Sequence, residues 1–341
     1  MTNFTINRLS SLKATLSSSL TRRLLTTTAL LMLLLVCSVS ERAFAQQFKP
    51  RGDFDGDGHT DLAVFRPSEG TWYAQSYFYE TTITRNWGNA DDLIVPEDYD
   101  GDYITDFAVF RPSEGNWYIL ESSTGKARLL SLGVAGDIPV PSDYNGDGKA
   151  DLAIFRPSHG YWEVRDIDGT LLISGKFGGM DGDKPVPGDY TGDGRSDFAY
   201  YRPDEGNWYV VDSATRKLDV RQWGESGDQP VPADYDGDGR ADIAVFRPSE
   251  GNWYIIGSAK QQVTLQGWGN ADDIPVPGNY DGGLNANIAV FRPSEGKWYV
   301  FNSSANAAMV VENWGMEGDI PVPSAYLPRK DAPQSSIYVT K

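Results

Sequence analysis

The sequence has almost no cysteine or histidine, and this scarcity excludes several kinds of structure and chemistry. Its 341 residues include one cysteine, Cys37, and two histidines, His59 and His159. Cys37 lies in a segment that we expect to be removed on export, so the folded domain cannot rest on disulfides. His59 lies within an aspartate-rich loop and His159 lies in a turn slot that the other repeats fill with glutamate, so zinc motifs and His-dependent triads lack their parts. No catalytic residue is predicted.

Long hydrophobic runs are also missing, except for one near the N-terminus. Basic residues such as Arg22 and Arg23 precede the run "LLTTTALLMLLLVCSV", and Ala43-Phe44-Ala45 supplies the small residues of a cleavage site. This pattern predicts a signal peptide over residues 1–45 and a secreted, cell-surface or periplasmic protein. The run is shorter than the roughly 20 residues of a spanning helix, so no stable membrane span is expected after cleavage. A membrane anchor and lipidation at Cys37 remain alternatives.

Positive charge is scarce as well. Without the five basic residues and one glutamate of residues 1–45, the 30 basic and 47 acidic residues become 25 and 46, a net charge of −21 with neutral histidine. A surface of this sign would repel the phosphate backbone. Nucleic acid is therefore not an expected partner.

A repeat of about 45 residues fills the rest of the chain. The triplet Phe-Arg-Pro, or Tyr-Arg-Pro once, recurs at spacings of 45, 45, 46, 45 and 45 residues. Each unit reads as four short strands separated by Gly, Pro, Asn and Asp, and the run "DLAVF" is continuously apolar, as expected of a strand covered on both faces. Four strands in about 45 residues are typical of a propeller blade.

We therefore predict an all-β fold, a single β-propeller over residues 46–341 with six full repeats and a partial C-terminal repeat. The segments "VPSAY" (322–326) and "SIYVTK" (336–341) resemble the first two strands of a further unit. Seven blades, the last one two-stranded, are favoured. A six-bladed ring with a C-terminal appendage is the alternative.

An aspartate-rich loop lies between the first two strands of each repeat. In "DYDGDGRAD" (234–242), aspartates occupy positions 1, 3, 5 and 9, and glycines occupy positions 4 and 6. Four unpaired carboxylates would repel one another, and Ca²⁺, which takes six to eight oxygen ligands, would relieve this repulsion. The position-7 backbone carbonyl is a further expected ligand. Position 9 opens a strand, so the loop is not an EF-hand.

We expect Ca²⁺ at about four or five of the six loops. The predicted ligands, including four position-7 residues that act through the backbone, are Asp53, Asp55, Asp57, His59 and Asp61; Asp98, Asp100, Asp102 and Asp106; Asp143, Asn145, Asp147, Lys149 and Asp151; Asp189, Thr191, Asp193, Arg195 and Asp197; and Asp234, Asp236, Asp238, Arg240 and Asp242. Tyr103 replaces the second glycine and is expected to distort its turn, and Thr191 weakens its loop. The sixth loop, from Asn279 to Asn287, has lost most of its charge and predicts no tight site.

The stretches "WGNADDIPVPGNYDGG" and "DYDGDGRADIAVFRP" resemble the FG-GAP repeat of integrin α-subunit propellers and of bacterial VCBS-type proteins. Trp-Gly stands in the Phe-Gly slot, Phe-Arg-Pro stands in the Gly-Ala-Pro slot, and the resemblance covers nearly all of residues 48–341. It implies that the matching aspartates bind Ca²⁺ between two strands of a blade. Literal Gly-Ala-Pro is absent, which favours a bacterial relative over an integrin subunit and leaves the partner open.

Strand parity places the "RPSEG" turns and the connections between blades on the face opposite the Asp loops. Repeated arginines and aspartates there are expected to form pairs, and recognition of a partner is the alternative interpretation. The repeated tryptophans are expected to pack between blades rather than to stack on sugars. The tripeptide Arg51-Gly52-Asp53 is interpreted as a coincidence, since Asp53 already belongs to a metal loop.

The sequence thus predicts an exported, calcium-binding propeller that acts as a non-catalytic interaction or adhesion module, with a protein or glycan partner on the face opposite the loops. A carbohydrate-binding lectin is the first alternative. A polysaccharide-active enzyme using paired carboxylates is the second.

Overall fold

A computed structural model describes residues 51–76, 81–180, 182–302 and 307–323. The chain divides into two compact units, residues 1–48 and 49–341, and the fold below belongs to the second. The predicted signal peptide lies outside the described residues. Within the described part, no helix is long and apolar enough to cross a membrane.

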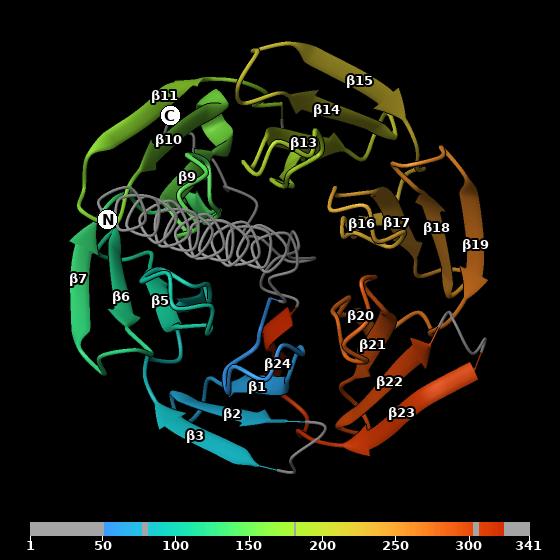
Figure 1. Cartoon of the computed structure of the whole chain (residues 1–341), viewed down its shortest axis with the longest axis horizontal. Helices are drawn as coiled ribbons and strands as arrows, with labels where there is room; N and C mark the ends of the chain where they lie inside the picture. Colours follow the sequence, from blue (N-terminus) through green and yellow to red (C-terminus); the bar gives the residue numbers. More distant parts are fainter. Residues whose placement is uncertain (1–50, 77–80, 181, 303–306, 324–341) are drawn as a thin grey trace, which may run out of the picture. The chain divides into compact units, whose positions relative to one another are not determined.

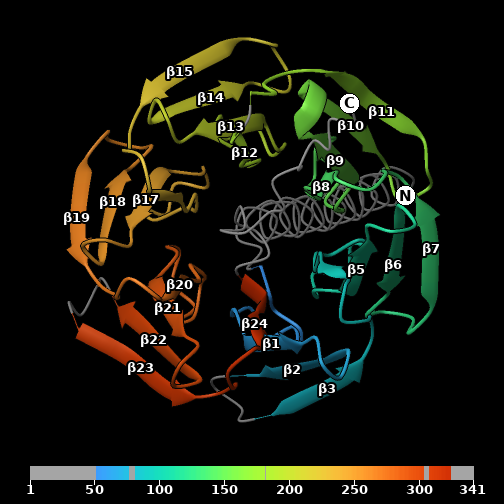
Figure 2. The same ribbon diagram turned by 180° about the vertical axis from the view of Figure 1, so that it is seen from behind.

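The described strands form six antiparallel four-stranded sheets, arranged as the blades of a ring (Figure 1). Figure 2 shows the same ring from behind, with the outermost strand of each blade along the rim. The all-β propeller prediction is confirmed.

The strands of each blade are given from the centre outward. Blade 1 has β24 (Ile320–Pro321), β1 (Leu62–Arg66), β2 (Thr71–Gln75) and β3 (Thr82–Asn86); blade 2 has β4 (Leu93–Ile94), β5 (Phe107–Arg111), β6 (Asn116–Leu120) and β7 (Ala127–Ser131). Blade 3 has β8 (Ile138–Pro139), β9 (Leu152–Arg156), β10 (Tyr161–Arg165) and β11 (Leu171–Lys176), with the 3-10 turn η1 (Pro157–His159) between β9 and β10. Blade 4 has β12 (Lys184–Pro185), β13 (Phe198–Arg202), β14 (Asn207–Val211) and β15 (Leu218–Gln222). Blade 5 has β16 (Gln229–Pro230), β17 (Ile243–Arg247), β18 (Asn252–Ile256) and β19 (Val263–Gly267); blade 6 has β20 (Ile274–Pro275), β21 (Ile288–Arg292), β22 (Lys297–Asn302) and β23 (Ala307–Asn313).

The ring has six blades because its last strand completes the first blade. In β24, Ile320 pairs with Phe65 and Pro321 pairs with Val64, both on β1. The N-terminal part of the described chain contributes only three strands to blade 1, namely β1, β2 and β3. The last strand, β24, supplies the innermost one. The six-bladed alternative is therefore the one observed, and the favoured seventh blade is not formed by the described residues. Residues 324–341, which include the segment "SIYVTK", lie outside them.

The second strand of each blade is buried on both faces. In β5, residues Phe107 to Phe110 are all buried and only Arg111 is partly exposed, and the same pattern recurs in β1, β9, β13, β17 and β21. Neighbouring blades cover the two faces, which explains the apolar run that does not alternate. An alanine recurs as the second residue of this strand and is 0–1% exposed in every blade: Ala63, Ala108, Ala153, Ala199, Ala244 and Ala289. This small side chain lets the sheets of neighbouring blades pack closely.

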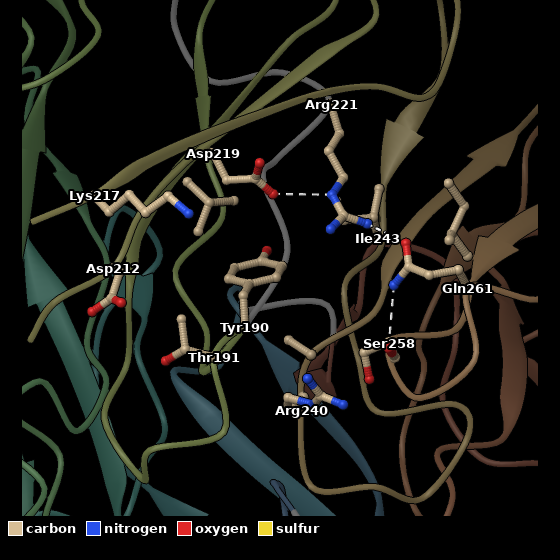
Figure 3. Close-up of a pocket in the computed structure, with 13 residues that line it drawn as sticks. Tyr190, Thr191, Asp212, Lys217, Asp219, Arg221, Arg240, Ile243, Ser258 and Gln261 are labelled. Carbon is tan, nitrogen blue, oxygen red and sulfur yellow. Dashed lines mark hydrogen bonds and ion pairs between the residues drawn. The ribbon is translucent and has the colours of Figure 1, made fainter. Parts of the chain in front are cut away.

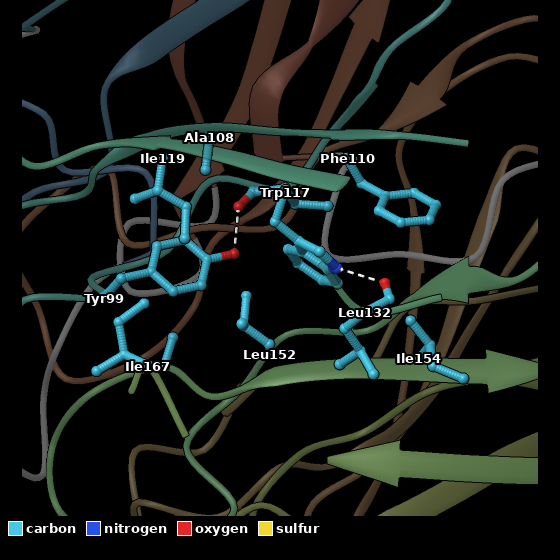
Figure 4. Close-up of a cluster of buried hydrophobic side chains, with 11 residues drawn as sticks. Tyr99, Ala108, Phe110, Trp117, Ile119, Leu132, Leu152, Ile154 and Ile167 are labelled. Atoms are coloured by element: carbon cyan, nitrogen blue, oxygen red, sulfur yellow. Dashed lines mark hydrogen bonds between the residues drawn. The ribbon is translucent and has the colours of Figure 1, made fainter. Parts of the chain in front are cut away.

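The core consists of clusters shared by adjacent blades, as Figure 4 shows for blades 2 and 3. Trp117 of β6 is fully buried and packs in one cluster with Leu152 and Ile154 of β9. Its indole N–H donates to the backbone oxygen of Leu132 at 2.9 Å, which satisfies the one polar atom of the side chain. All six tryptophans of this slot are at most 2% exposed. The prediction that they pack in the core is confirmed.

Candidate metal centres and an interblade pocket

The Asp loops are built around two aspartates that collect backbone N–H groups. In blade 5, Asp234 accepts hydrogen bonds from Gly237 at 2.6 Å and Gly239 at 2.7 Å, and Asp242 accepts one from Tyr235 at 2.8 Å. The two glycines have φ of 78° and 86°, angles that favour glycine. The loops of blades 1 to 4 repeat these bonds through the corresponding residues.

Tyr103 fits this loop geometry, so the expected distortion of the blade 2 turn is not observed. Its φ is 71°, and its N–H donates to Asp98 at 2.8 Å, as the glycine N–H does in the other loops. The side chain, 46% exposed, points away from the packed interior. Tyrosine therefore adopts the left-handed conformation at a local cost in strain, and the turn keeps its shape.

The turn between the third and fourth strands closes over the same loop, a feature that the sequence analysis missed. Ser258 donates its N–H to Asp242 at 2.6 Å and its hydroxyl to Asp238 at 2.7 Å, and the Ala259 N–H donates to Asp236 at 3.0 Å. In blade 2, Ser122 makes the matching bond to Asp106 at 2.6 Å. A serine recurs shortly after the third strand in blades 1, 2, 4 and 5, and this repeat in the sequence could have indicated the contact.

Three loops bring carboxylates together closely enough to hold one ion. Each of three trios has ligand atoms within 4.8 Å of one another: Asp53, Asp55 and Asp57; Asp98, Asp100 and Asp106; and Asp234, Asp236 and Asp242. These Asp clusters could bind a metal ion. Asp53 is only 2% exposed, which agrees with the interpretation of the Arg-Gly-Asp tripeptide as a coincidence.

The remaining predicted ligands have other partners. Asp61 accepts the Phe54 N–H at 2.7 Å, and Asp102 accepts the Ser122 hydroxyl at 3.0 Å. Asp238 accepts two hydrogen bonds from the Arg240 guanidinium, at 2.7 and 3.0 Å, and is not a member of the trio of its own loop. A metal centre in blade 5 therefore needs other oxygens in place of Asp238.

The four position-7 residues are held by their backbone. Each N–H donates to the position-5 aspartate: His59 to Asp57, Lys149 to Asp147 and Arg240 to Asp238 at 2.9 Å, and Arg195 to Asp193 at 3.0 Å. These bonds fix the peptide that follows each aspartate. Ligation by the position-7 carbonyl stays a prediction.

The loops of blades 3, 4 and 6 differ where their sequences depart from the pattern. Among the described residues, neither Asp143, Asp147 and Asp151 nor Asp189, Asp193 and Asp197 form such a trio. The Asn145 amide donates to Asp147 and Asp151, both at 3.2 Å. In blade 6, the Asn287 and Asn302 amides donate to Asp281 at 3.0 and 3.1 Å. In blades 3 and 6, side-chain amides thus donate to carboxylate oxygens that a cation would need.

Burial makes the metal-free loops electrostatically costly. Desolvation, reinforced by neighbouring carboxylates, raises the pKa of Asp61 to about 8 and the pKa of Asp242 to about 7. The same causes raise the pKa of Asp106 and Asp151 to about 7 and that of Asp53 and Asp197 to about 6. A carboxylate that is desolvated beside others is stabilised by a bound cation, so these residues fit a hard metal ion.

The raised pKa values predict that the metal-free protein becomes less stable as pH rises. Between the ordinary pKa of 3.8 and the folded value of about 8, Asp61 binds more protons folded than unfolded. The free energy of unfolding changes with pH in proportion to the number of protons bound by the unfolded state minus the number bound by the folded state. This difference is negative here, so stability falls with increasing pH across this window. We expect the Tm in excess chelator to increase from about pH 8 down to about pH 5, measured by scanning calorimetry.

With saturating Ca²⁺ the trend should reverse, because protons compete with the ion for the same oxygens. Matched scans with Ca²⁺ are the control for the other titrating groups. A chelated protein whose Tm climbs steadily from pH 5 to pH 8 would contradict the description of these loops as buried and uncompensated.

A pocket of about 330 Å³ lies between blades 4 and 5, on the face of the Asp loops (Figure 3). Its walls include Tyr190 and Lys217 of blade 4 and Arg240 of blade 5. Gln261 closes one side, donating to the Ser258 carbonyl oxygen at 3.2 Å and accepting from the Arg221 guanidinium. Its φ is 52°, whereas Gly125 occupies the same slot of the turn in blade 2. Blade 5 thus keeps a polar side chain where glycine would be less strained.

Comparison with known proteins agrees with this architecture. The FG-GAP repeat family model matches residues 52–79 and 226–264. No curated relative matches the sequence. Among solved structures, a streptogramin B lyase has a TM-score of 0.52 and 11% identity, covering 78% of this chain and 85% of its own. Virginiamycin B lyase from Staphylococcus aureus has a TM-score of 0.50 and 8% identity, covering 81% and 85%.

A lectin from Agrocybe aegerita that recognises non-reducing terminal N-acetylglucosamine has a TM-score of 0.50 and 16% identity, covering 77% of this chain and 84% of its own. At these identities the likeness concerns the fold alone. The repeats matched by the family model fall on blade 1 and on blade 5 with its Asp loop. The chain is a six-bladed β-propeller that contains FG-GAP repeats at residues 52–79 and 226–264.

Proposed function

We propose that the protein is an exported β-propeller that Ca²⁺ stabilises and that binds a partner without catalysing a reaction. The observation that carries the proposal is the set of three carboxylate trios within 4.8 Å. Ca²⁺ accepts six to eight oxygens in flexible geometry, whereas Mg²⁺ demands near-ideal octahedral geometry. Loops that offer carboxylates, serine hydroxyls and backbone oxygens in an irregular arrangement suit Ca²⁺ better.

The ion is structural in this proposal. In blade 5, Asp234, Asp236 and Asp242 would hold it, with the Arg240 carbonyl as a further ligand. Bound Ca²⁺ supplies positive charge that offsets the desolvation of the aspartates. The same aspartates hold the N–H groups of the turn at Ser258, so the ion would also fix the link between the inner and outer strands of the blade.

Three observations support a binding role outside the cytoplasm. The FG-GAP propeller fold supports an interaction module in general, and the N-terminal sequence is typical of an export signal. The carboxylates of the loops occupy slots repeated from blade to blade, unlike an active site, which is usually a single departure from a repeat. The partner is a protein or a glycan, and the face with the Arg-Pro turns is its proposed surface.

Affinity capture tests the proposal. Residues 46–341 are immobilised and exposed to solubilised envelope and matrix material in Ca²⁺ or in chelator. We expect a defined protein or glycan to be retained in Ca²⁺ and lost in chelator, because the blades loosen without the ion. Retention of nothing under either condition would count against a binding module.

A lectin is the second candidate function, and the pocket between blades 4 and 5 favours it. Its polar lining, with Lys217, Ser258 and Gln261, offers donors and acceptors for hydroxyl groups in a volume typical of ligand sites. Glycan-array signal that is lost on Gln261→Gly would support this function. A polysaccharide-active enzyme remains the other alternative, and release of new reducing ends from a polymer would establish it.

A further inference from the structure

The face opposite the Asp loops carries a repeated ion-pair network. In blade 2, the Arg111 guanidinium donates two hydrogen bonds to buried Asp92, at 2.8 and 2.9 Å, and lies 4.4 Å from the ring centre of Tyr118. Glu114 lies 3.5 Å from the same guanidinium and accepts the Tyr118 hydroxyl at 2.6 Å. The Glu–Tyr bond recurs in five blades: Glu69–Tyr73, Glu114–Tyr118, Glu205–Tyr209, Glu250–Tyr254 and Glu295–Tyr299.

Blade 3 departs from this network at four slots at once. His159 replaces the glutamate, and Glu163 replaces the tyrosine. Tyr161 stands where the other blades have Thr, Asn or Lys, and its cross-strand partner is Lys176. The residues in the Lys176 slot elsewhere are Asn86, Ser131, Gln222, Gly267 and Asn313. These four changes break the repeat at one place only, as expected where a repeat protein has a specific binding site.

A hollow of about 220 Å³ lies at these changes, lined by Arg156, His159, Tyr161 and Lys176. Glu163 does not line it, because its carboxylate pairs with Arg165 at 2.7 Å and accepts the Tyr161 hydroxyl at 3.3 Å. The Ser158 hydroxyl oxygen lies 2.7 Å from Nδ1 of His159. A ligand would therefore contact the other ring nitrogen, Nε2.

Arg156 is the most exposed arginine of its slot. Its side chain is 31% exposed, against 12–20% for the five others, although it still pairs with Asp137 at 2.7 Å. The glutamate that covers the guanidinium elsewhere is replaced by His159. The Tyr161 ring lies beside it, with its centre 5.7 Å from the guanidinium carbon.

This place is therefore more positive than its counterparts in the other blades, because His159 replaces a glutamate and Lys176 replaces a neutral residue. The four side chains line the hollow with their apolar parts, so their charged and polar groups lie at its rim. Asp137 still pairs with Arg156, and Glu163 pairs with Arg165. Guanidinium and ammonium groups with one aromatic face suit a ring that carries an anionic substituent.

We infer that this hollow of blade 3 binds an anionic sugar unit of a glycan. The carboxylate or sulfate group would lie at the rim and accept hydrogen bonds from Lys176, Nε2 of His159 and Nη1 of Arg156. The Nε and Nη2 atoms of this arginine are held by Asp137. The sugar ring would lie in the apolar hollow against Tyr161. The inference rests on the proposed function, because it specifies the partner of the face opposite the Asp loops. Uronate and sulfate share the recognised chemistry, and separate probes distinguish them.

The test compares residues 46–341 in Ca²⁺ with a variant that restores the repeat, H159E/Y161N/E163Y/K176S. The probes are polygalacturonate, dextran sulfate, neutral dextran and polyglutamate, measured by biolayer interferometry at two salt concentrations. We expect the natural protein to bind one or both acidic polysaccharides, more weakly at high salt, and the variant to lose about tenfold or more in affinity. Neutral dextran should not bind.

The substitutions H159E, Y161N and E163Y copy the residues of several other blades, and K176S copies Ser131 of blade 2, so folding should be retained; thermal unfolding checks this. Lys126→Ser is the matched control, removing one exposed lysine on the Asp-loop face of blade 2, and its affinity should be unchanged. Equal binding by the restored variant, equal binding of polyglutamate, or no binding of either acidic polysaccharide would overturn the inference. A Ca²⁺-dependent Tm without polysaccharide binding would overturn this inference alone, leaving the proposed function.

Discussion

Adding Ca²⁺ to the metal-free protein is expected to raise its Tm by on the order of 10 °C or more. A site filled at one hundred times its Kd adds about 2.7 kcal/mol, and three carboxylate trios would act together. One kcal/mol moves the Tm of a domain of 150–250 residues by about 2–4 °C, and a larger ring moves less per kcal/mol. Scanning calorimetry of residues 46–341 across a Ca²⁺ titration measures the shift.

Titration calorimetry of the same protein should give about three tightly bound ions, with blades 3 and 4 contributing weaker sites. Mg²⁺ at equal concentration should give a much smaller shift, because it dehydrates reluctantly and demands octahedral geometry. No shift and no bound ion would show that the Asp loops are ordinary turns stabilised by their own hydrogen bonds.

A matched pair of variants assigns the ions to loops. Asp236→Asn changes position 3 of the blade 5 loop and should remove one tight ion. Asp281→Asn changes position 3 of the blade 6 loop, where amides of Asn287 and Asn302 already hold the carboxylate, and should leave the stoichiometry unchanged. Loss of an ion from both variants would show that the blade 6 loop also binds metal.

The blades and their Asp loops could be predicted from sequence because both repeat within one unit. The apolar run at Phe107 to Phe110 and the aspartate spacing from Asp234 to Asp242 each depend on residues close in the chain. Local patterns of this kind fix strand order and loop geometry without knowledge of the whole ring. The fold class and the buried tryptophans follow from them. The same pattern predicts ligands in five loops, of which three form carboxylate trios among the described residues.

Contacts between distant residues could not be predicted in the same way. The sequence shows that His159 and Glu163 depart from the repeat. It does not show that Lys176 on β11 lies opposite Tyr161 on the neighbouring strand β10. Arg240 lies in the same loop as Asp238, yet only the structure shows that it occupies that carboxylate. The blade count depends on Ile320 pairing with Phe65, and an inner strand has the same sequence pattern in a six-bladed or seven-bladed ring.

Truncation after Gly318 is expected to lower the Tm by on the order of 10 °C or to abolish a single cooperative transition. It removes Asp319, whose carboxylate accepts two hydrogen bonds from Arg66 at 2.8 and 2.9 Å, and the β24 strand that pairs with β1. It also removes Val322, which is fully buried beside Phe65 and Trp72. Loss of a buried charge partner costs about 3–5 kcal/mol, and an unburied valine adds about 1.5–3 kcal/mol.

Truncation after Pro323 is the matched control, because it keeps Asp319, β24 and Val322 and removes only residues 324–341. We expect this shorter chain to retain the Tm and the Ca²⁺ response of residues 46–341, since the closing strand of a six-bladed ring is still present. Calorimetry and near-ultraviolet circular dichroism measure both truncations. If the two shortened chains lose stability equally, the ring is closed by residues beyond Pro323, and the pairing of β24 with β1 is not what holds the first and last blades together.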